Sequence, residues 1–134
     1  MVPAPVLVHL VGPLRVELEG RELAPAEVAS RKGRTLLRLL CARRGEVLTA
    51  TEIAGVLWPE DPPSDPDAVV ASLASRLRRV LGAAAIGGGR EGYRLGAVET
   101  DVDRARRLVD DAEAAPSALA VAGAAAAVRL LEDG

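Results

Sequence analysis

The sequence has almost no aromatic side chains: it contains one tryptophan, one tyrosine and no phenylalanine in 134 residues. A hydrophobic core must therefore consist mainly of leucine, valine and alanine, and 49% of the residues are apolar. Proteins that bind single-stranded nucleic acid stack its bases on aromatic rings, so we do not expect this chain to be one of them. The length fits one domain, or one domain with an appendage.

Cysteine and histidine are equally scarce, with one of each. A single cysteine excludes an internal disulfide framework, and this content argues against a zinc site. The sequence also offers no Ser/His/Asp or Cys/His combination of the kind that nucleophilic enzymes use for catalysis. We therefore predict a protein that has no cofactor and no bound metal and is not an enzyme. His9 is expected on a strand surface or hydrogen-bonded at a sheet edge, without a catalytic role.

Long hydrophobic runs are missing as well. The longest one, residues 118–128, is too short to span a bilayer and consists largely of alanine. Met1 is followed by no basic segment, so the sequence shows no signal peptide. These features predict a cytoplasmic protein with no membrane partner.

The chain also lacks the strong positive charge of many nucleic-acid-binding domains, because its formal net charge is −2. The charge is unevenly distributed. Residues 1–96 hold 13 Lys/Arg and 11 Asp/Glu, whereas residues 97–134 hold 4 and 8. Between residues 31 and 44 there is no acid but there are six basic residues: Arg31, Lys32, Arg34, Arg38, Arg43 and Arg44. This local charge is compatible with one binding face and does not require one.

The stretch 65–81 is predicted to form one amphipathic helix. Asp65 can cap its start, Pro66 suits the first helical position, and Gly82 can end it. One side is apolar and carries Val70, Leu73, Ala74, Leu77, Val80 and Leu81. The opposite side carries Ala68, Ser72, Ser75 and Arg79, with Arg76 at its edge. Such a side can approach a flat, negatively charged surface such as DNA, or it can be the solvated side of an ordinary core helix.

The other segments alternate between strand and helix patterns. Strands are predicted at 6–11, 14–19 and 21–23, with a tight turn at 19–21. Helices are predicted from the cap at Ser30 to Gly45, from the capping box Thr49-x-x-Glu52 to Pro59, from Thr100-x-x-Asp103 onward, and at 118–132. A hairpin should follow Gly82, with strands at 83–86 and 93–95 and a glycine-rich tip between them. Helix, loop, helix and hairpin in this order are typical of a winged helix-turn-helix.

Five motifs add a family resemblance. They are LVGPLRV at 10–16, RKGRTLL at 31–37, LWPEDPP at 57–63, SRLRRVLG at 75–82 and GYRL at 92–95. In this order they resemble the OmpR/PhoB-type DNA-binding domain, and more closely its version in the Streptomyces antibiotic regulatory protein family. The resemblance covers residues 5–96. It implies an α+β fold with an N-terminal antiparallel sheet of four strands, a three-helix core and a C-terminal wing.

The resemblance also implies roles for particular residues. DNA contacts would come from Ser72, Ser75, Arg76, Arg78, Arg79, Arg90 and Arg94. The loop 59–66 has four prolines and is therefore stiff. The resemblance implies that its acids Glu60 and Asp61 contact RNA polymerase. The alternative is that the loop is a spacer that contacts no partner. The chain departs from the family where the helix 65–81 begins, because Ala68, Val69 and Ala71 stand where polar, base-reading residues are usual, and Glu91 lies in the wing. A transcription regulator that binds double-stranded DNA is therefore weighed against a winged-helix domain used as a protein-interaction module.

The resemblance divides the chain at residue 97. Residues 1–97 would form the winged helix-turn-helix, and residues 98–134 would begin a tetratricopeptide-like bacterial transcriptional activation domain with a helical hairpin. The second helix of that hairpin, 118–132, is apolar almost all round and must be buried. Its excess apolar surface is expected to form an exposed patch, a homodimer contact or a frayed end.

Overall fold

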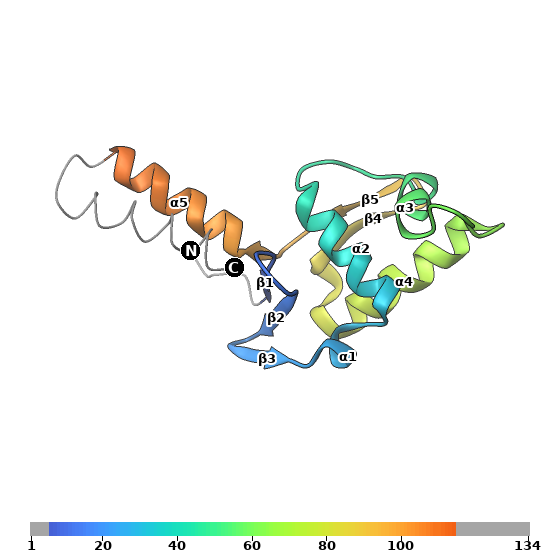
Figure 1. Cartoon of the computed structure of the whole chain (residues 1–134), viewed down its shortest axis with the longest axis horizontal. Helices are drawn as coiled ribbons and strands as arrows, with labels where there is room; N and C mark the ends of the chain where they lie inside the picture. The colour runs from blue at the N-terminus through green and yellow to red at the C-terminus, as the bar shows by residue number, and fades with distance from the viewer. Residues whose placement is uncertain (1–5, 115–134) are drawn as a thin grey trace.

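A computed structural model of the protein describes residues 6–114, and it has the predicted α+β winged-helix architecture (Figure 1). Its elements are β1 (Val6–His9), β2 (Arg15–Leu18), β3 (Arg21–Leu23), α1 (Pro25–Val28), α2 (Arg31–Ala42), α3 (Ala50–Leu57), α4 (Pro66–Leu81), a 3-10 turn η1 (Ala83–Ala85), β4 (Ile86–Gly89), β5 (Gly92–Leu95), β6 (Glu99–Thr100) and α5 (Asp101–Ala114). None of the helices in this range is long and apolar enough to cross a membrane. The predicted helix 118–132, and with it the second half of the helical hairpin, lies outside the described residues.

The N-terminal sheet has the strand order β3-β2-β1-β6. Its first three strands are antiparallel, as predicted. The turn between β2 and β3 has positive φ angles at Glu19 (52°) and Gly20 (84°), and Gly20 adopts its angle without strain because it has no Cβ. The fourth strand, β6, follows the wing in sequence and pairs parallel with β1, with Val8 opposite Thr100. The sheet is therefore mixed, and the chain after residue 97 contributes to it.

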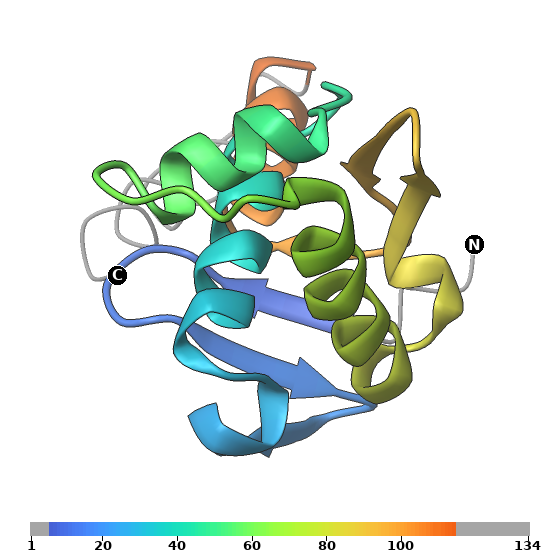
Figure 2. The same cartoon turned by 90° about the vertical axis from the view of Figure 1, so that its right-hand side faces the viewer.

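Helices α2 and α4 lie against one face of this sheet, α3 packs against α2 and α4, and the β4–β5 hairpin lies beside α4 (Figure 2). One hydrophobic core joins all these layers, and it is built mainly from leucine and valine. Its fully buried large side chains include Val6, Val8, Val16, Leu36, Leu37, Leu40, Ile53, Val70, Leu77 and Ile86. Burial of each such side chain stabilises the fold by roughly 1.5–3 kcal/mol.

The structure differs from the predicted elements at two further places, the segments 83–86 and 25–28. The segment 83–86, predicted as a strand, forms the 3-10 turn η1, and only Ile86 belongs to β4. Three consecutive alanines show no alternation of apolar and polar side chains, so the sequence does not distinguish a strand from a 3-10 turn here. The short helix α1 was not predicted, although Pro25 occupies its first turn and Glu27 closes back on the Ala24 N–H.

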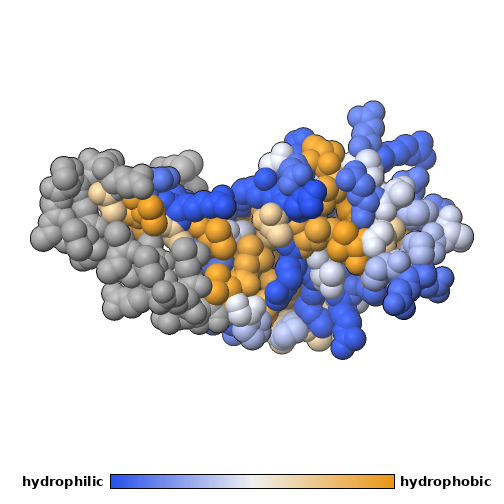
Figure 3. All heavy atoms as spheres, turned by 45° about the horizontal axis from the view of Figure 1, so that its top comes forward, coloured by the Kyte–Doolittle hydropathy of each residue, from blue (hydrophilic) through white to orange (hydrophobic). Residues whose placement is uncertain are grey.

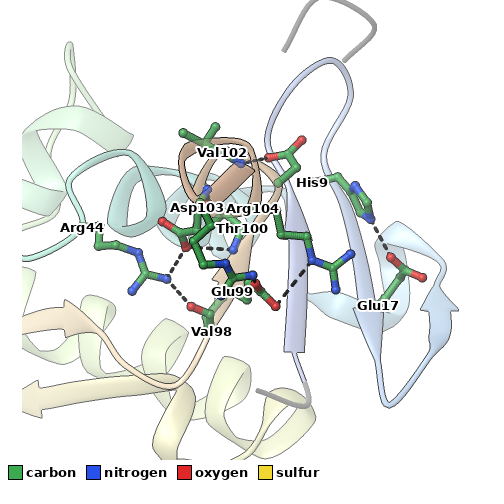
Figure 4. A network of polar contacts seen from close by, with 11 residues as sticks. His9, Glu17, Arg44, Val98, Glu99, Thr100, Val102, Asp103 and Arg104 are labelled. Carbon is green, nitrogen blue, oxygen red and sulfur yellow. Dashed lines mark hydrogen bonds and ion pairs between the residues drawn. The ribbon is translucent and has the colours of Figure 1, made fainter. Parts of the chain in front are cut away.

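Polar contacts fix the start of α5 against the sheet and α2 (Figure 4). The Asp103 carboxylate accepts from the Thr100 N–H at 3.0 Å, and the Thr100 hydroxyl accepts from the Asp103 N–H at 3.0 Å, which is the predicted capping box. Arg44, just beyond the end of α2, pairs with Asp103 at 2.8 Å and donates to the Val98 carbonyl. Beyond this junction, α5 extends away from the helical core (Figure 1).

Candidate nucleic-acid interface

Helix α4 begins and ends at the predicted signals. The Asp65 side chain accepts a hydrogen bond from the Ala68 N–H at 3.2 Å, and Pro66 occupies the first turn. Gly82 ends the helix with φ at 104°, a conformation that is rare for other residues. The helix is therefore set by local chemistry at both ends, and its orientation is set by the apolar side that packs into the core.

The two sides of α4 differ as the sequence predicts. Val70, Leu73, Ala74, Leu77 and Leu81 are buried, and Val80 is half-buried. The outward side exposes five residues: Ala68, Ser72, Ser75, Arg76 and Arg79. This side ends in two arginines and otherwise carries small side chains, so a flat partner can approach the helix backbone closely.

Helix α3 precedes α4 and completes the helix-turn-helix. Its capping box is formed as predicted, because Thr49 accepts from the Glu52 N–H and Glu52 accepts from the Thr49 N–H, both at 3.1 Å. The Thr49 hydroxyl also donates to the Glu52 carboxylate at 3.0 Å, and the bonds that the carboxylate accepts from the Thr49 backbone and side chain lower the pKa of the Glu52 carboxyl group. The end of α3 is held by Lys32, which donates to the Leu57 carbonyl and lies over the Trp58 ring, 5.1 Å from its centroid. Lys32 thus fixes the point where the loop 59–65 leaves the core.

The wing is the β4–β5 hairpin, and Leu48 adds a third chain segment to it. Leu48 and Tyr93 exchange two backbone hydrogen bonds of 2.8 Å. Gly88 has a positive φ of 90°, and a Cβ there would collide with the Gly92 backbone. The glycines predicted as the tip therefore extend β4 to Gly89 and allow close contact between the two strands.

Two arginines are exposed on the wing. Arg94 is paired with Gly87 across the hairpin, and its side chain lies over that glycine, since a Cβ at position 87 would come within 3.0 Å of Arg94 Nε. Arg90 lies at the tip and lines an open groove of about 450 Å³ between the wing and the start of α4. The other residues lining this groove are Asp65, Asp67, Ala68, Ala71 and Tyr93. Ala71 and Tyr93 were not among the predicted site residues, because an alanine and a buried tyrosine carry no charge signal in the sequence.

The arginines of this surface differ in their partners. Within residues 6–112, Arg76, Arg79, Arg90 and Arg94 form neither a hydrogen bond nor an ion pair through their side chains. Arg78, in contrast, is half-buried and donates to two wing carbonyls. Six of the seven predicted residues are therefore exposed on α4 or the wing, whereas the seventh, Arg78, is directed into the fold.

Four of the six basic residues of the run 31–44 have polar partners within the molecule. Lys32 holds the end of α3, Arg34 donates to the Pro25 and Ala29 carbonyls, Arg43 pairs with Glu46 at 2.8 Å, and Arg44 holds the start of α5. Arg31 and Arg38 are exposed. Most of the positive charge that the sequence concentrates here therefore stabilises the fold.

The acidic loop 59–65 lies at the end of the molecule where α3 finishes and α4 begins (Figure 1). Glu60, Asp61, Asp65 and Asp67 are all exposed. Figure 3 shows this end of the molecule as a hydrophilic surface. A carboxylate-rich loop repels phosphate, so it is suited to a partner other than DNA or to solvent.

Comparison with known proteins shows which family this chain resembles. Residues 26–95 match the family described as "Transcriptional regulatory protein, C terminal". The chain belongs to this family. The resemblance to OmpR/PhoB-type regulators is thereby confirmed. The matched residues run from α1 to the end of the wing.

Two relatives are regulators of actinobacteria. The chain is 39% identical over 112 residues to the regulatory protein AfsR of Streptomyces coelicolor, a match that covers 81% of this chain and 11% of AfsR. It is 30% identical over 107 residues to the transcriptional regulatory protein EmbR of Mycobacterium bovis, covering 75% of this chain and 27% of EmbR. The chain thus spans only a small part of the length of these relatives.

A solved structure gives the same fold. The structure of Mycobacterium tuberculosis EmbR in complex with a low-affinity phosphopeptide matches 96% of this chain and 35% of that chain, with a TM-score of 0.75 and 24% sequence identity. The arrangement of sheet, three-helix core and wing is therefore that of a known winged-helix regulator.

Proposed function

We propose that this member of the transcriptional regulatory protein family binds double-stranded DNA, with α4 in the major groove and the wing on the adjacent backbone. One observation supports this most strongly: Arg76, Arg79, Arg90 and Arg94 are exposed on α4 and the wing, and none is paired within the described residues. Arginines that neutralise phosphates release counterions, which supplies much of the affinity of such proteins for DNA.

Base recognition would come from the outward side of α4. Ser72 and Ser75 are exposed there, and serine hydroxyls can donate to or accept from base edges. Ala68 and Ala71 are exposed nearer the start of the helix, and an alanine methyl group makes only apolar contacts. We therefore assign the phosphate contacts to the arginines and the base contacts to the two serines.

The acidic loop would serve a second partner. Its exposed acids Glu60 and Asp61 lie on a stiff proline-rich segment whose start is held by Lys32, so the loop is ordered before a partner binds. We propose RNA polymerase as that partner, as the family resemblance suggests. The chain from residue 98 would begin the activation domain, with α5 as its first helix and a homodimer contact as one use of the predicted helix 118–132.

A protein-interaction module without specific DNA binding is the alternative. It is favoured by a shallow groove of about 270 Å³ lined by Leu39, Arg43, Leu48, Glu52 and Val56. Val56, which lines the groove, is 54% exposed, and Val47, the residue before Leu48 in sequence, is 55% exposed, so both offer apolar surface to a partner. The net charge of −2 also fits this alternative.

Titration of the full chain with random duplex DNA at low and moderate salt separates the two functions. A DNA-binding regulator binds at low salt and loses affinity steeply as salt rises, because counterion release drives the association. Selection of tight binders from a random duplex pool then reports whether the outward side of α4 discriminates between sequences. Absence of duplex binding at low salt would leave the interaction module as the function.

A further inference from the structure

Arg78 belongs to the arginine run of α4, but its guanidinium group is directed to the wing. Nε donates to the Ile86 carbonyl and Nη2 donates to the Gly88 carbonyl, each at 2.9 Å. The same group lies over the Tyr93 ring, 6.0 Å from its centroid. One side chain of α4 therefore contacts both strands of the hairpin.

Helical geometry explains why Arg78 differs from its neighbours. At about 100° per residue, Arg79 lies in the middle of the outward side and Arg76 on the shoulder away from Arg78. Arg78 lies on the opposite shoulder, next to the wing, and is half-buried, whereas Arg76 and Arg79 are exposed. The spacing that makes the three arginines look equivalent in sequence gives them three different directions in space.

The contacts of Arg78 reach further up the wing than the backbone contacts at its base. The Gly96 N–H donates to the Ala85 carbonyl at 2.8 Å where the hairpin meets η1. Gly88 lies one residue before the end of β4, close to the turn that carries Arg90. A bond at Gly88 therefore restrains the outer part of the hairpin against α4.

We propose that Arg78 is a positioning residue that holds the wing at a fixed distance from α4, so that Arg90 and Arg94 reach DNA while α4 occupies the major groove. The inference rests on the proposed DNA-binding function and assigns Arg78 a role through the wing in place of a direct DNA contact. Arginine suits this role because its rigid fork of N–H donors can serve two carbonyls at once. Lysine has a single nitrogen at the end of a flexible stem.

Hydrogen exchange of the DNA-free full chain tests the positioning role first. The variants Arg78→Met, which keeps an apolar stem, and Arg78→Lys should both speed amide exchange in β4 and β5 while leaving exchange in α2 unchanged. Arg79→Ala is the matched control, because Arg79 is the next residue of the same helix and makes no polar side-chain contact with the wing. Unchanged wing exchange in both Arg78 variants would overturn the proposal.

Affinity for random duplex DNA gives the second readout. Arg78→Met should weaken binding in the otherwise unchanged chain, but have no effect in a chain that already carries Arg90→Ala and Arg94→Ala, because a wing without these arginines gains nothing from being positioned. A direct phosphate contact would instead produce the same fold-loss in both backgrounds and reduce the salt slope by about 1 in each. If the unchanged chain binds no duplex DNA, the proposed function fails, while the exchange experiment still decides whether Arg78 holds the wing.

Discussion

The carboxylate of Asp101 accepts a hydrogen bond of 2.9 Å from the backbone N–H of Leu10, a residue 91 positions earlier in the chain. The other carboxylate oxygen accepts from the Val11 N–H at 3.1 Å, and the side chain is almost fully buried. The first residue of α5 thereby closes the end of β1. The winged-helix fold and the helix that follows it are joined by a buried carboxyl side chain as well as by the β6 strand.

Asp101→Asn should lower the free energy of unfolding by about 2–3 kcal/mol, because an amide side chain has one acceptor oxygen and leaves a backbone N–H without its charged partner. Chemical denaturation of the full chain measures this. Asp110→Asn is the control, since Asp110 is exposed on the same helix and its loss should change stability by less than about 0.5 kcal/mol. Equal, small effects of both variants would show that the Asp101 contacts contribute little.

Burial raises the pKa of the Cys41 thiol from its ordinary value of 9.0 to about 12. The folded chain therefore keeps a proton that the unfolded chain releases above about pH 9, so this residue's contribution to stability falls as the pH rises from about 9 to about 12. The stability advantage of the unchanged chain over Cys41→Ala should accordingly be smaller at about pH 11 than at about pH 8. An advantage that stays constant over this range would mean that the thiol ionises equally in both states.

The same burial makes Cys41 a reporter of unfolding. A thiol reagent reacts with the thiolate, so labelling of the native chain at neutral pH should be slow and should accelerate in denaturant. Rapid labelling without denaturant would show that the α2 region opens on the time scale of the reaction.

The variant carrying Glu60→Gln and Asp61→Asn should separate the two partners proposed for the molecule. Neutralising these exposed acids removes negative charge that a polymerase surface would recognise, so activated transcription should fall while duplex affinity stays the same or rises slightly. A reporter assay and a DNA titration of the same variant provide the two measurements. If neither changes, the loop acts as a spacer; if duplex affinity rises strongly, the loop lies closer to the DNA than proposed.

Local signals were sufficient to predict the elements that position the site. Asp65, Pro66 and Gly82 gave both ends of α4, and the apolar periodicity identified its buried side. The capping boxes at Thr49 and Thr100 were also predicted, because each is formed by residues three apart. These features depend on neighbours in sequence, so a sequence contains most of the information that determines them.

Features that depend on distant residues could not be predicted in the same way. The strand β6 has two residues and exists because β1 offers an edge, so Thr100 was interpreted only as a helix cap. The wing carbonyls that accept from Arg78 carry no side-chain signal, and Arg78 was grouped with arginines that face outward. Likewise, the charge run 31–44 was compatible with a binding face, whereas Lys32, Arg34 and Arg44 find partners in α3, α1 and the start of α5.

The salt dependence of duplex binding by the triple variant Arg76→Ala, Arg79→Ala and Arg94→Ala tests the proposed DNA face most directly. Each lost phosphate contact should flatten the slope of log affinity against log salt by about 0.9, so the triple variant should differ from the unchanged chain by about 3 and bind all duplexes more weakly. Thermal unfolding of the variant serves as the control for folding, since all three side chains are exposed. Unchanged affinity and an unchanged slope in a folded triple variant would show that DNA, if bound, contacts another surface.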